Sequence, residues 1–372
     1  MRFYLLPLLW VVTLTACVKP QIQMQTKASV NGPRLTPTSV IMSDGYELPL
    51  KTWPSIYASA SISSAIHTPI NNVTSNNEPT NYEPTNYEPI NYKPGAVVLA
   101  VHGFNDYSNA FETVAKYFAQ HSITTYAIDQ RGFGTTSQRG VWAGGAVMRS
   151  DLLSTVTLLC EKHAGQDLFL LGESMGGAVI MSVIKSLDKT CVKGVILSAP
   201  AVWGWQMMPW WQTMPLRLLA HTIPAYTLTG EGLDIKPSDN IDMLRALGKD
   251  PFIIKETRID AMYGLTDLME AALLNSSELT MPALILYGER DEIIPPESFC
   301  EMFNKLPIQS EAGWRMLLYQ NGYHMLTRDL QGYVVIEDML SWIQNQNAAL
   351  PSAQEVVKGD ARLSVFSECD VD

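Results

Sequence analysis

The stretch Phe169-Leu170-Leu171-Gly172-Glu173-Ser174-Met175-Gly176-Gly177-Ala178 decides the fold of this chain. An apolar run typical of a buried strand leads directly into Gly-x-Ser-x-Gly, and a helical pattern follows. A serine between a strand and a helix occupies a strained turn, for which Gly172 and Gly176 leave room. The dipole of the following helix favours negative charge at its start. This context predicts a nucleophilic serine at position 174; the alternative is a small-residue turn that serves packing alone.

Apolar strands and helices alternate on both sides of this window, which predicts an α/β fold with a mostly parallel sheet and helices on both faces. The predicted strands cover residues 96–101, 123–128, 168–171, 192–197, 283–287 and 316–319. The predicted helices cover residues 106–118, 146–163, 175–187, 297–305 and 329–346. Upstream, two strands at 40–42 and 46–53 flank an Asp-Gly turn. Between 201 and 275 the alternation stops, and we expect a mostly helical cap inserted between two strands.

A serine nucleophile needs a base and a carboxylate that orients this base. Of six histidines, His324 is the one that follows a late strand and precedes a helix, which predicts a position at the carboxyl edge of the sheet, above the serine. Three acids, Glu289, Asp291 and Glu292, follow the strand at 283–287. The sequence therefore predicts a Ser-acid-His arrangement in this chain order.

Acyl transfer also needs donors for a developing oxyanion. The strand before position 102 ends in His102-Gly103-Phe104-Asn105, in a loop expected at the same sheet edge. The backbone N–H groups of Phe104 and Met175 are the predicted donors. We expect His102 to pack and form hydrogen bonds beneath the site rather than to react.

The region from about residue 40 to 346 resembles the α/β-hydrolase superfamily, and within it the monoacylglycerol lipase and lysophospholipase (serine aminopeptidase S33-type) group. Six motifs in order carry the resemblance: Ser43-Asp44-Gly45, His102-Gly103-Phe104, Asp129-Gln130-Arg131-Gly132-Phe133-Gly134, Gly172-Glu173-Ser174-Met175-Gly176-Gly177, Gly288-Glu289-Arg290-Asp291 and Tyr323-His324. The resemblance implies an α/β-hydrolase fold with a helical cap, Ser174 as nucleophile, Asp291 as acid and His324 as base.

This resemblance leads us to expect hydrolysis of carboxylic esters of single-chain lipids, monoacylglycerol or lysophospholipid, through an acyl-enzyme. Two alternatives use the same triad: an aminopeptidase or amidase, and an acyltransferase. A third alternative is a non-catalytic binding lipoprotein. No metal or organic cofactor is expected, because the chain carries none of their motifs.

Large apolar side chains gather at the start of the predicted cap. Trp203, Trp205, Trp210 and Trp211 lie close to three methionines, within twelve residues. Aromatic and methionine surfaces suit flexible apolar ligands, so we predict that these tryptophans bind the acyl chain of the substrate. The alternative is that they form the core of the cap itself.

The first residues predict export and lipidation. Arg2 precedes an apolar run, and Leu14-Thr15-Ala16-Cys17 resembles the bacterial lipobox. Residues 1–17 are therefore predicted to be a lipoprotein signal peptide, with palmitate on Cys17 tying the chain to a membrane leaflet. If the resemblance to the lipobox holds, the rule known for enterobacterial lipoproteins implies the outer membrane, facing the periplasm, because Val18 rather than Asp follows the cysteine. The alternative is an ordinary secretory signal with a fortuitous cysteine.

The rest of the chain divides by composition. Residues 18–37 are predicted to be a polar tether, and residues 38–347 the hydrolase domain. Within it, residues 55–94 are a low-complexity insertion with a proline in each five-residue repeat, which excludes regular helix. Residues 348–372 are expected to be a loose acidic tail.

Composition excludes several classes of function. The net charge of −11 repels phosphate backbones, so nucleic acid is not an expected partner. The uncharged run at 3–17 is shorter than the ~20 residues of a spanning helix, which excludes a polytopic membrane protein. After export, Cys160 and Cys191 could pair or could be two buried thiols. The sequence carries no signal for an oligomeric state.

Overall fold

The structure is a computed structural model that describes residues 20, 22–23, 32–56, 95–230, 232–308, 313–357, 360, 363 and 369. The predicted lipidation site Cys17, most of the predicted tether and most of the low-complexity insertion lie outside these residues. Within the described part of the chain, no helix is long and apolar enough to cross a membrane.

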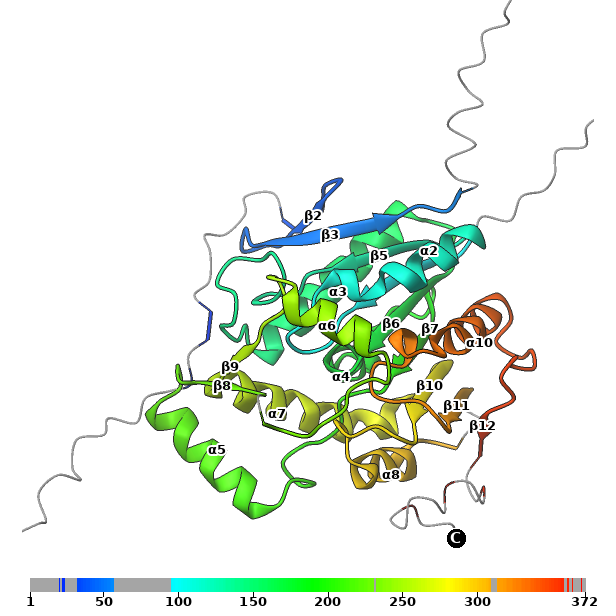
Figure 1. Cartoon of the computed structure of the whole chain (residues 1–372). Coiled ribbons are helices and arrows are strands. Elements are labelled where there is room, and N and C mark those ends of the chain that lie inside the picture. Colours follow the sequence, from blue (N-terminus) through cyan, green and yellow to red (C-terminus); the bar gives the residue numbers. More distant parts are fainter. Residues whose placement is uncertain are drawn as a thin grey trace, which may run out of the picture.

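A ten-stranded sheet runs through the centre of the molecule in the order β1-β2-β3-β5-β4-β6-β7-β10-β11-β12 (Figure 1). The six middle strands are parallel: β5 (Thr124–Ile128), β4 (Val97–Val101), β6 (Leu168–Glu173), β7 (Val192–Ser198), β10 (Ala283–Gly288) and β11 (Trp314–Tyr319). Antiparallel strands complete both edges: β1 (Arg34–Leu35), β2 (Ser39–Ile41) and β3 (Glu47–Trp53) on one side, and β12 (Glu355–Val356) on the other. The predicted mostly parallel sheet is confirmed.

Helices cover both faces of the sheet, because successive residues of the middle strands point to opposite sides. In β4, Val97, Leu99 and Val101 join one apolar core, whereas Val98 and Ala100 join the other. The first core includes side chains of α3 (Gly145–Lys162), α4 (Met175–Ser182) and α8 (Pro296–Lys305). The second includes side chains of α2 (Glu112–Gln120) and α10 (Gly332–Gln344). The α/β architecture predicted from the alternating pattern is therefore present.

The segment between β7 and β10 is mostly helical. It contains α5 (Trp210–Thr222), α6 (Ile241–Lys249) and α7 (Ile259–Leu274), together with a small antiparallel pair of strands, β8 (Thr227–Thr229) and β9 (Glu256–Arg258). Helix α7 packs on both α4 and α5, so it joins the segment to the sheet. Neither of these short strands was predicted from the sequence, which shows no comparable strand pattern in this segment.

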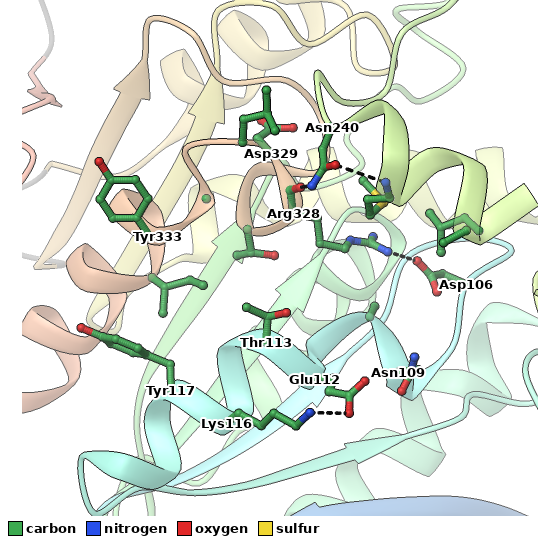
Figure 2. Close-up of a pocket in the computed structure, with 18 of the residues that line it drawn as sticks. Asp106, Asn109, Glu112, Thr113, Lys116, Tyr117, Asn240, Arg328, Asp329 and Tyr333 are labelled. Carbon is green, nitrogen blue, oxygen red and sulfur yellow. Dashed lines mark hydrogen bonds and ion pairs between the residues drawn. The ribbon is translucent and has the colours of Figure 1, made fainter.

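A cavity of about 670 Å³ lies between α2, α6 and the start of α10 (Figure 2). Its walls carry polar and charged side chains, among them Asp106 and Arg328, whose ion pair is drawn in the figure. The same two residues also line a second cavity, to which Ser174 contributes. The pair therefore forms part of the wall between the two cavities.

The expectation of a free tether before residue 38 is wrong for the described residues. The strand β1 pairs with β2, and the backbone N–H of Gln23 donates to the carbonyl oxygen of Trp142 at 3.0 Å. The side chain of Gln23 also donates to the carbonyl of Val141 at 2.8 Å. Backbone hydrogen bonds of this kind depend on a distant partner segment, which the local composition does not reveal.

The expectation of a loose tail after residue 347 is also wrong for its described part. Strand β12 pairs with β11, and Glu355 within it accepts hydrogen bonds from the guanidinium of Arg315. Cys369, near the end of the chain, is buried and disulfide-bonded to Cys300 of α8. Glu355, one of the acidic residues of the tail, thus forms an ion pair with Arg315 of β11, beside the strand that completes the sheet edge.

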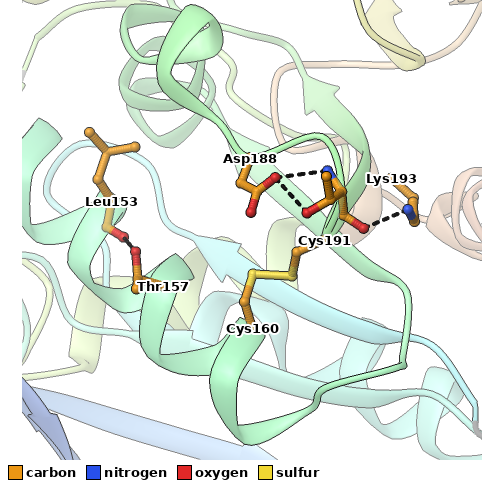
Figure 3. The surroundings of a disulfide bond; sticks show 7 residues. Leu153, Thr157, Cys160, Asp188, Cys191 and Lys193 are labelled. Atoms are coloured by element: carbon orange, nitrogen blue, oxygen red, sulfur yellow. Dashed lines mark hydrogen bonds between the residues drawn. A yellow bond between two sulfur atoms is a disulfide. The ribbon is translucent and has the colours of Figure 1, made fainter.

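A second disulfide settles the alternative left open for Cys160 and Cys191. The two residues are bonded with an S–S distance of 2.03 Å, which ties the end of α3 to the start of β7 (Figure 3). Both bonds join residues far apart in sequence, by 31 and 69 positions. Such covalent cross-links are typical of oxidising compartments.

Candidate active site

Ser174 occupies a sharp turn between β6 and α4. Its backbone has φ 51° and ψ −116°, a region that residues with a side chain rarely adopt. The turn is held from both directions, since the Ser174 N–H donates to the Ser198 carbonyl at 2.9 Å and its carbonyl accepts from the N–H of Ala201 at 3.0 Å. The strained conformation predicted from Gly-x-Ser-x-Gly is present.

The glycines of the motif allow the close approach of neighbouring backbone. A Cβ added to Gly176 would lie 1.9 Å from the carbonyl oxygen of Val101, and one added to Gly172 would lie 2.6 Å from the Gly177 nitrogen. Neither space admits a methyl group. The turn can therefore form beside β4 only because these positions have no side chain.

His324 and Asp291 lie on the loops that follow the adjacent parallel strands β11 and β10. The His324 Nδ1 and the Asp291 Oδ2 are 2.8 Å apart. The second oxygen, Oδ1, accepts the backbone N–H groups of Ile293 and Ile294 at 2.8 and 3.0 Å. The Asp291 side chain is completely buried and that of His324 is 7% exposed. The carboxylate is thus fixed, and it orients the imidazole.

Of the three acids that follow β10, Asp291 is the one that bonds to His324. Glu292 instead accepts the backbone N–H of Lys236 at 2.7 Å, in an exposed position. The structure therefore brings together the acid and the histidine that the resemblance implied.

Two opposing effects act on the pKa of His324. Burial lowers this pKa, whereas the negative charge of Asp291 and its hydrogen bond, with a contribution from Glu173, raise it; the net pKa is above the ordinary value of 6.5. Because Nδ1 is bonded to Asp291, Nε2 is the ring nitrogen that remains for proton exchange. Ser174 and His324 line the same cavity.

The loop after β4 lies against the serine. A Cβ added to Gly103 would be 3.4 Å from the Ser174 Cβ. Phe104 follows in this loop and lines the cavity, and Met175 is the first residue of α4. Among the described residues, the backbone N–H of neither Phe104 nor Met175 donates to a protein acceptor. Two uncommitted donors therefore lie on the elements that flank the serine.

His102 lies beneath this loop and is completely buried. Its Nε2 accepts the backbone N–H of Gln130 at 2.9 Å, so its Nδ1 donates to the Gly103 carbonyl at 2.8 Å. Burial lowers the pKa of His102 below the usual range, which keeps the ring neutral. Both ring nitrogens are occupied, so His102 supports the loop as expected and is not available as a base.

A cavity of about 510 Å³ opens above Ser174. The polar side chains that line it include those of Asn105, Asp106, Glu173 and Arg328. The other walls are apolar and come mainly from the segment between β7 and β10: Trp203, Met208, Leu216, Leu228, Leu233, Met262, Leu265 and Met269. The cavity thus combines a few charged side chains, of which Asp106 and Glu173 are paired with Arg328, with a mainly apolar lining.

Of the four tryptophans predicted to bind substrate, Trp203 lines this cavity. Trp205 packs between α5 and α7, where its Nε1 donates to Asp267 at 2.7 Å and its ring lies 5.1 Å from that of Tyr263. Trp210 and Trp211, 76% and 59% exposed, project from α5 and are not among the lining residues. The structure therefore does not place these three tryptophans in the wall of the cavity, where the prediction expected them. For Trp210 and Trp211, the direction of the side chain depends on how α5 crosses α7.

Several leucines in the apolar lining were not predicted from the sequence. Leu228 and Leu233 come from the region of β8, and Leu265 comes from α7. They carry no local signal beyond being apolar residues in the predicted cap. Within the described ranges, no group of three or more His, Cys, Asp or Glu side chains is placed to hold a metal ion.

The parallel sheet, with Ser174, Asp291 and His324 on the connections that follow β6, β10 and β11 at its carboxyl edge, defines an α/β-hydrolase fold. The sequence profile of the family described as serine aminopeptidase, S33, matches residues 92–331. The chain therefore belongs to the serine aminopeptidase S33 family.

Among curated relatives, a monoacylglycerol lipase of Mycolicibacterium smegmatis is 22% identical over 67% of this chain and 88% of its own length. A monoglyceride lipase of Mus musculus is 23% identical over 69% of this chain and 84% of its own length. One similar solved structure is a soluble variant of monoglyceride lipase from Saccharomyces cerevisiae, in complex with a substrate analog. Its TM-score is 0.62 at 21% identity, and the match covers 89% of this chain and 99% of that one. These relatives support a carboxylic ester hydrolase.

Proposed function

We propose that the protein hydrolyses carboxylic esters of single-chain lipids, monoacylglycerols or lysophospholipids, through an acyl-enzyme. The observation that carries the proposal is His324, which Asp291 orients and which lines one largely apolar cavity together with the strained Ser174. The names of the relatives, monoacylglycerol and monoglyceride lipase, support the lipid substrate.

In the proposed reaction, His324 Nε2 takes the proton of the Ser174 hydroxyl as its oxygen attacks the ester carbonyl. The backbone N–H groups of Phe104 and Met175 stabilise the oxyanion that forms. Protonated His324 then gives its proton to the departing alcohol, which leaves the acyl group on Ser174. A water molecule, activated by His324, releases the fatty acid and restores the enzyme. Asp291 holds the imidazole and stabilises its positive charge in both halves of the reaction.

The apolar and the polar residues that line the cavity suit the two halves of such an ester. The apolar walls favour an acyl chain, since each methylene removed from water contributes ~0.8 kcal/mol. The polar side chains of the lining suit a leaving alcohol that carries further hydroxyl groups. A peptide amine would instead need a free carboxylate, but the two carboxylates of this cavity, Asp106 and Glu173, are both paired with Arg328. The cavity therefore favours lipid esters over peptides.

We further propose that Cys17 is lipidated and holds the enzyme on the periplasmic side of the outer membrane. The lipobox-like sequence supports this location, and so do the two disulfides. Cys17→Ser should move the protein from the membrane fraction to the soluble fraction without changing its activity. A variant that stays membrane-bound in high salt contradicts the proposed anchor.

A fluorophosphonate probe tests the proposed chemistry directly. It should label the wild-type protein at Ser174 and leave Ser174→Ala unlabelled, whereas a binding protein without activity would not react. Initial rates over p-nitrophenyl esters, monoacylglycerols, lysophospholipids and aminoacyl amides then separate the reactions. A preference for aminoacyl amides over all esters would overturn the proposed substrate class while leaving the triad in place.

A further inference from the structure

Three loops at the carboxyl edge of the sheet meet at one buried guanidinium, that of Arg328. Its Nη1 donates to Asp106 Oδ2 at 2.7 Å, the contact drawn in Figure 2. Its Nη2 donates to Glu173 Oε1. One planar group thus joins two carboxylates that come from different strand–loop connections.

Each of these loops carries one part of the proposed chemistry. Asp106 lies two residues after Phe104, the proposed oxyanion donor, and Glu173 immediately precedes the nucleophile Ser174. Arg328 lies four residues after the proposed base, in the short 3₁₀ helix Leu326–Arg328. The guanidinium therefore bridges the segments that hold the donor, the nucleophile and the base.

All three charged side chains are largely buried. Those of Arg328 and Asp106 are each 8% exposed and that of Glu173 is 4% exposed. Asp106 also closes its own loop, because its backbone N–H donates to the Gly103 carbonyl and its Oδ1 accepts the N–H of Tyr107 at 2.8 Å. A change at the guanidinium is thus transmitted to the turn that contains the oxyanion donor.

We propose that Arg328 is a positioning residue, whose guanidinium sets the relative placement of the oxyanion loop, the serine turn and the histidine loop. The inference rests on the proposed ester hydrolysis. Transition-state stabilisation requires donors ~2.7–3.1 Å from the developing oxyanion, and a displacement of ~1 Å can cost ~100-fold in rate. The ammonium group of a lysine cannot replace this guanidinium, because it is a point charge without a fixed geometry for two carboxylates.

The chain contains a matched control in Arg131. This guanidinium is also buried and also joins two carboxylates: it donates to Asp151 at 2.6 and 2.9 Å and to Asp44 at 2.9 Å. Its partners lie on α3 and in the turn between β2 and β3, and it is absent from the lining of the active-site cavity. Arg131→Lys therefore measures the effect of replacing such a guanidinium away from the reaction.

The experiment measures kcat, KM and the thermal midpoint for wild type, Arg328→Lys and Arg131→Lys with p-nitrophenyl octanoate, at a temperature where circular dichroism shows each variant folded. For Arg328→Lys we expect kcat to fall ~10–100-fold with KM changed less than ~3-fold, because alignment rather than binding is lost. The rate of fluorophosphonate labelling should fall in parallel. For Arg131→Lys we expect a lower thermal midpoint and a kcat within ~2-fold of wild type.

The pH profile adds a readout that a purely structural role would not change. The charged groups that face His324 are Asp291, Glu173 and Arg328; the positive charge of Arg328 lowers the pKa of His324 and the negative charge of Glu173 raises it. Arg328→Met should therefore move the acid limb of kcat/KM to higher pH, and Glu173→Gln should move it to lower pH.

Because Arg328→Met leaves two buried carboxylates without their partner, the triple variant Asp106→Asn/Glu173→Gln/Arg328→Met is measured beside it. This variant removes all three charges, and we expect it to fold but to lose kcat as Arg328→Lys does. A kcat for Arg328→Lys equal to that of Arg131→Lys would overturn the proposal. Failure of the proposed function is distinct: the wild-type protein would then neither hydrolyse esters nor react with the probe.

Discussion

The carboxyl edge of the sheet and helix α5 differ in how far their side chains are constrained. At the sheet edge, Ser174, Asp291 and His324 are buried, and hydrogen bonds from neighbouring loops hold each segment. On α5, Ala220 is the one buried residue, whereas Trp210 and Trp211 are largely exposed. The comparison indicates that the hydrogen-bonded carboxyl edge of the sheet fixes the geometry of the triad. The exposed outer face of α5 takes no part in these contacts.

The largest effect is expected from the nucleophile. Ser174→Ala should lower kcat/KM by ~10⁴-fold or more, because the reacting hydroxyl is lost from a turn that the surrounding hydrogen bonds maintain. Steady-state kinetics and the thermal midpoint check this together. Ser198→Ala is a suitable control, since the hydroxyl of Ser198 is buried in the neighbouring strand and has no hydrogen-bond partner among the described residues. More than a few per cent residual activity in Ser174→Ala contradicts the assignment.

The next effect should come from the acid. Asp291→Asn should lower kcat by ~10³–10⁴-fold, because an amide no longer holds the imidazole in the correct tautomer. Glu292→Gln alters an exposed carboxylate that contacts Lys236, and its kcat should stay near that of wild type. If the two variants exchange these results in the same kinetic assay, the acid has been assigned to the wrong residue.

The pH dependence follows from the same pair. His324 acts as a base only when it is neutral, and its pKa is raised above 6.5. Activity should therefore be lost as the pH falls through a midpoint above 6.5, with kcat/KM decreasing about tenfold per pH unit below it. A pH–rate profile of the wild-type enzyme checks this value. An acid limb with its midpoint below 6 would mean that another group, or a less perturbed histidine, controls the reaction.

A smaller effect is expected in the apolar walls. In the wild type, kcat/KM should rise from acetyl to medium-chain (~C8–C12) esters, because each buried methylene contributes ~0.8 kcal/mol. Trp203→Ala and Leu228→Ala should reduce the octanoyl-to-acetyl ratio by ~10-fold, the equivalent of about two methylenes. The measurement uses monomeric p-nitrophenyl esters below micelle formation. A steady fall in kcat/KM from acetyl to octanoyl would leave an esterase without preference for lipids.

The smallest effect is expected on the exposed face of α5. Trp210→Ala and Trp211→Ala should leave the octanoyl-to-acetyl ratio within ~2-fold of wild type, because surface side chains away from a site contribute little. This expectation replaces the one drawn from composition, in which these tryptophans bind the acyl chain. The same monomeric esters test it, with Trp203→Ala as the internal comparison. A flattened chain-length profile in Trp211→Ala would show that α5 moves over the cavity during turnover.

The sequence by itself determined the α/β fold and the strained backbone conformation at Ser174. Strands buried on both faces are uniformly apolar, and the glycines around the serine mark a turn that admits no side chain. It also placed His324 after a late strand, because the carboxyl ends of parallel strands lie at one sheet edge. These features depend on a few neighbouring residues, so the local pattern contained them.

The tertiary structure alone decided which distant groups meet. It assigned the orienting role to Asp291 among three nearby acids, turned Trp203 inward and Trp210 outward, and joined Cys300 to Cys369. It also brought Arg328 to two carboxylates that lie 155 and 222 residues away in the chain. Contacts of this kind depend on how helices cross and loops approach each other, and no local pattern of residue types encodes that packing.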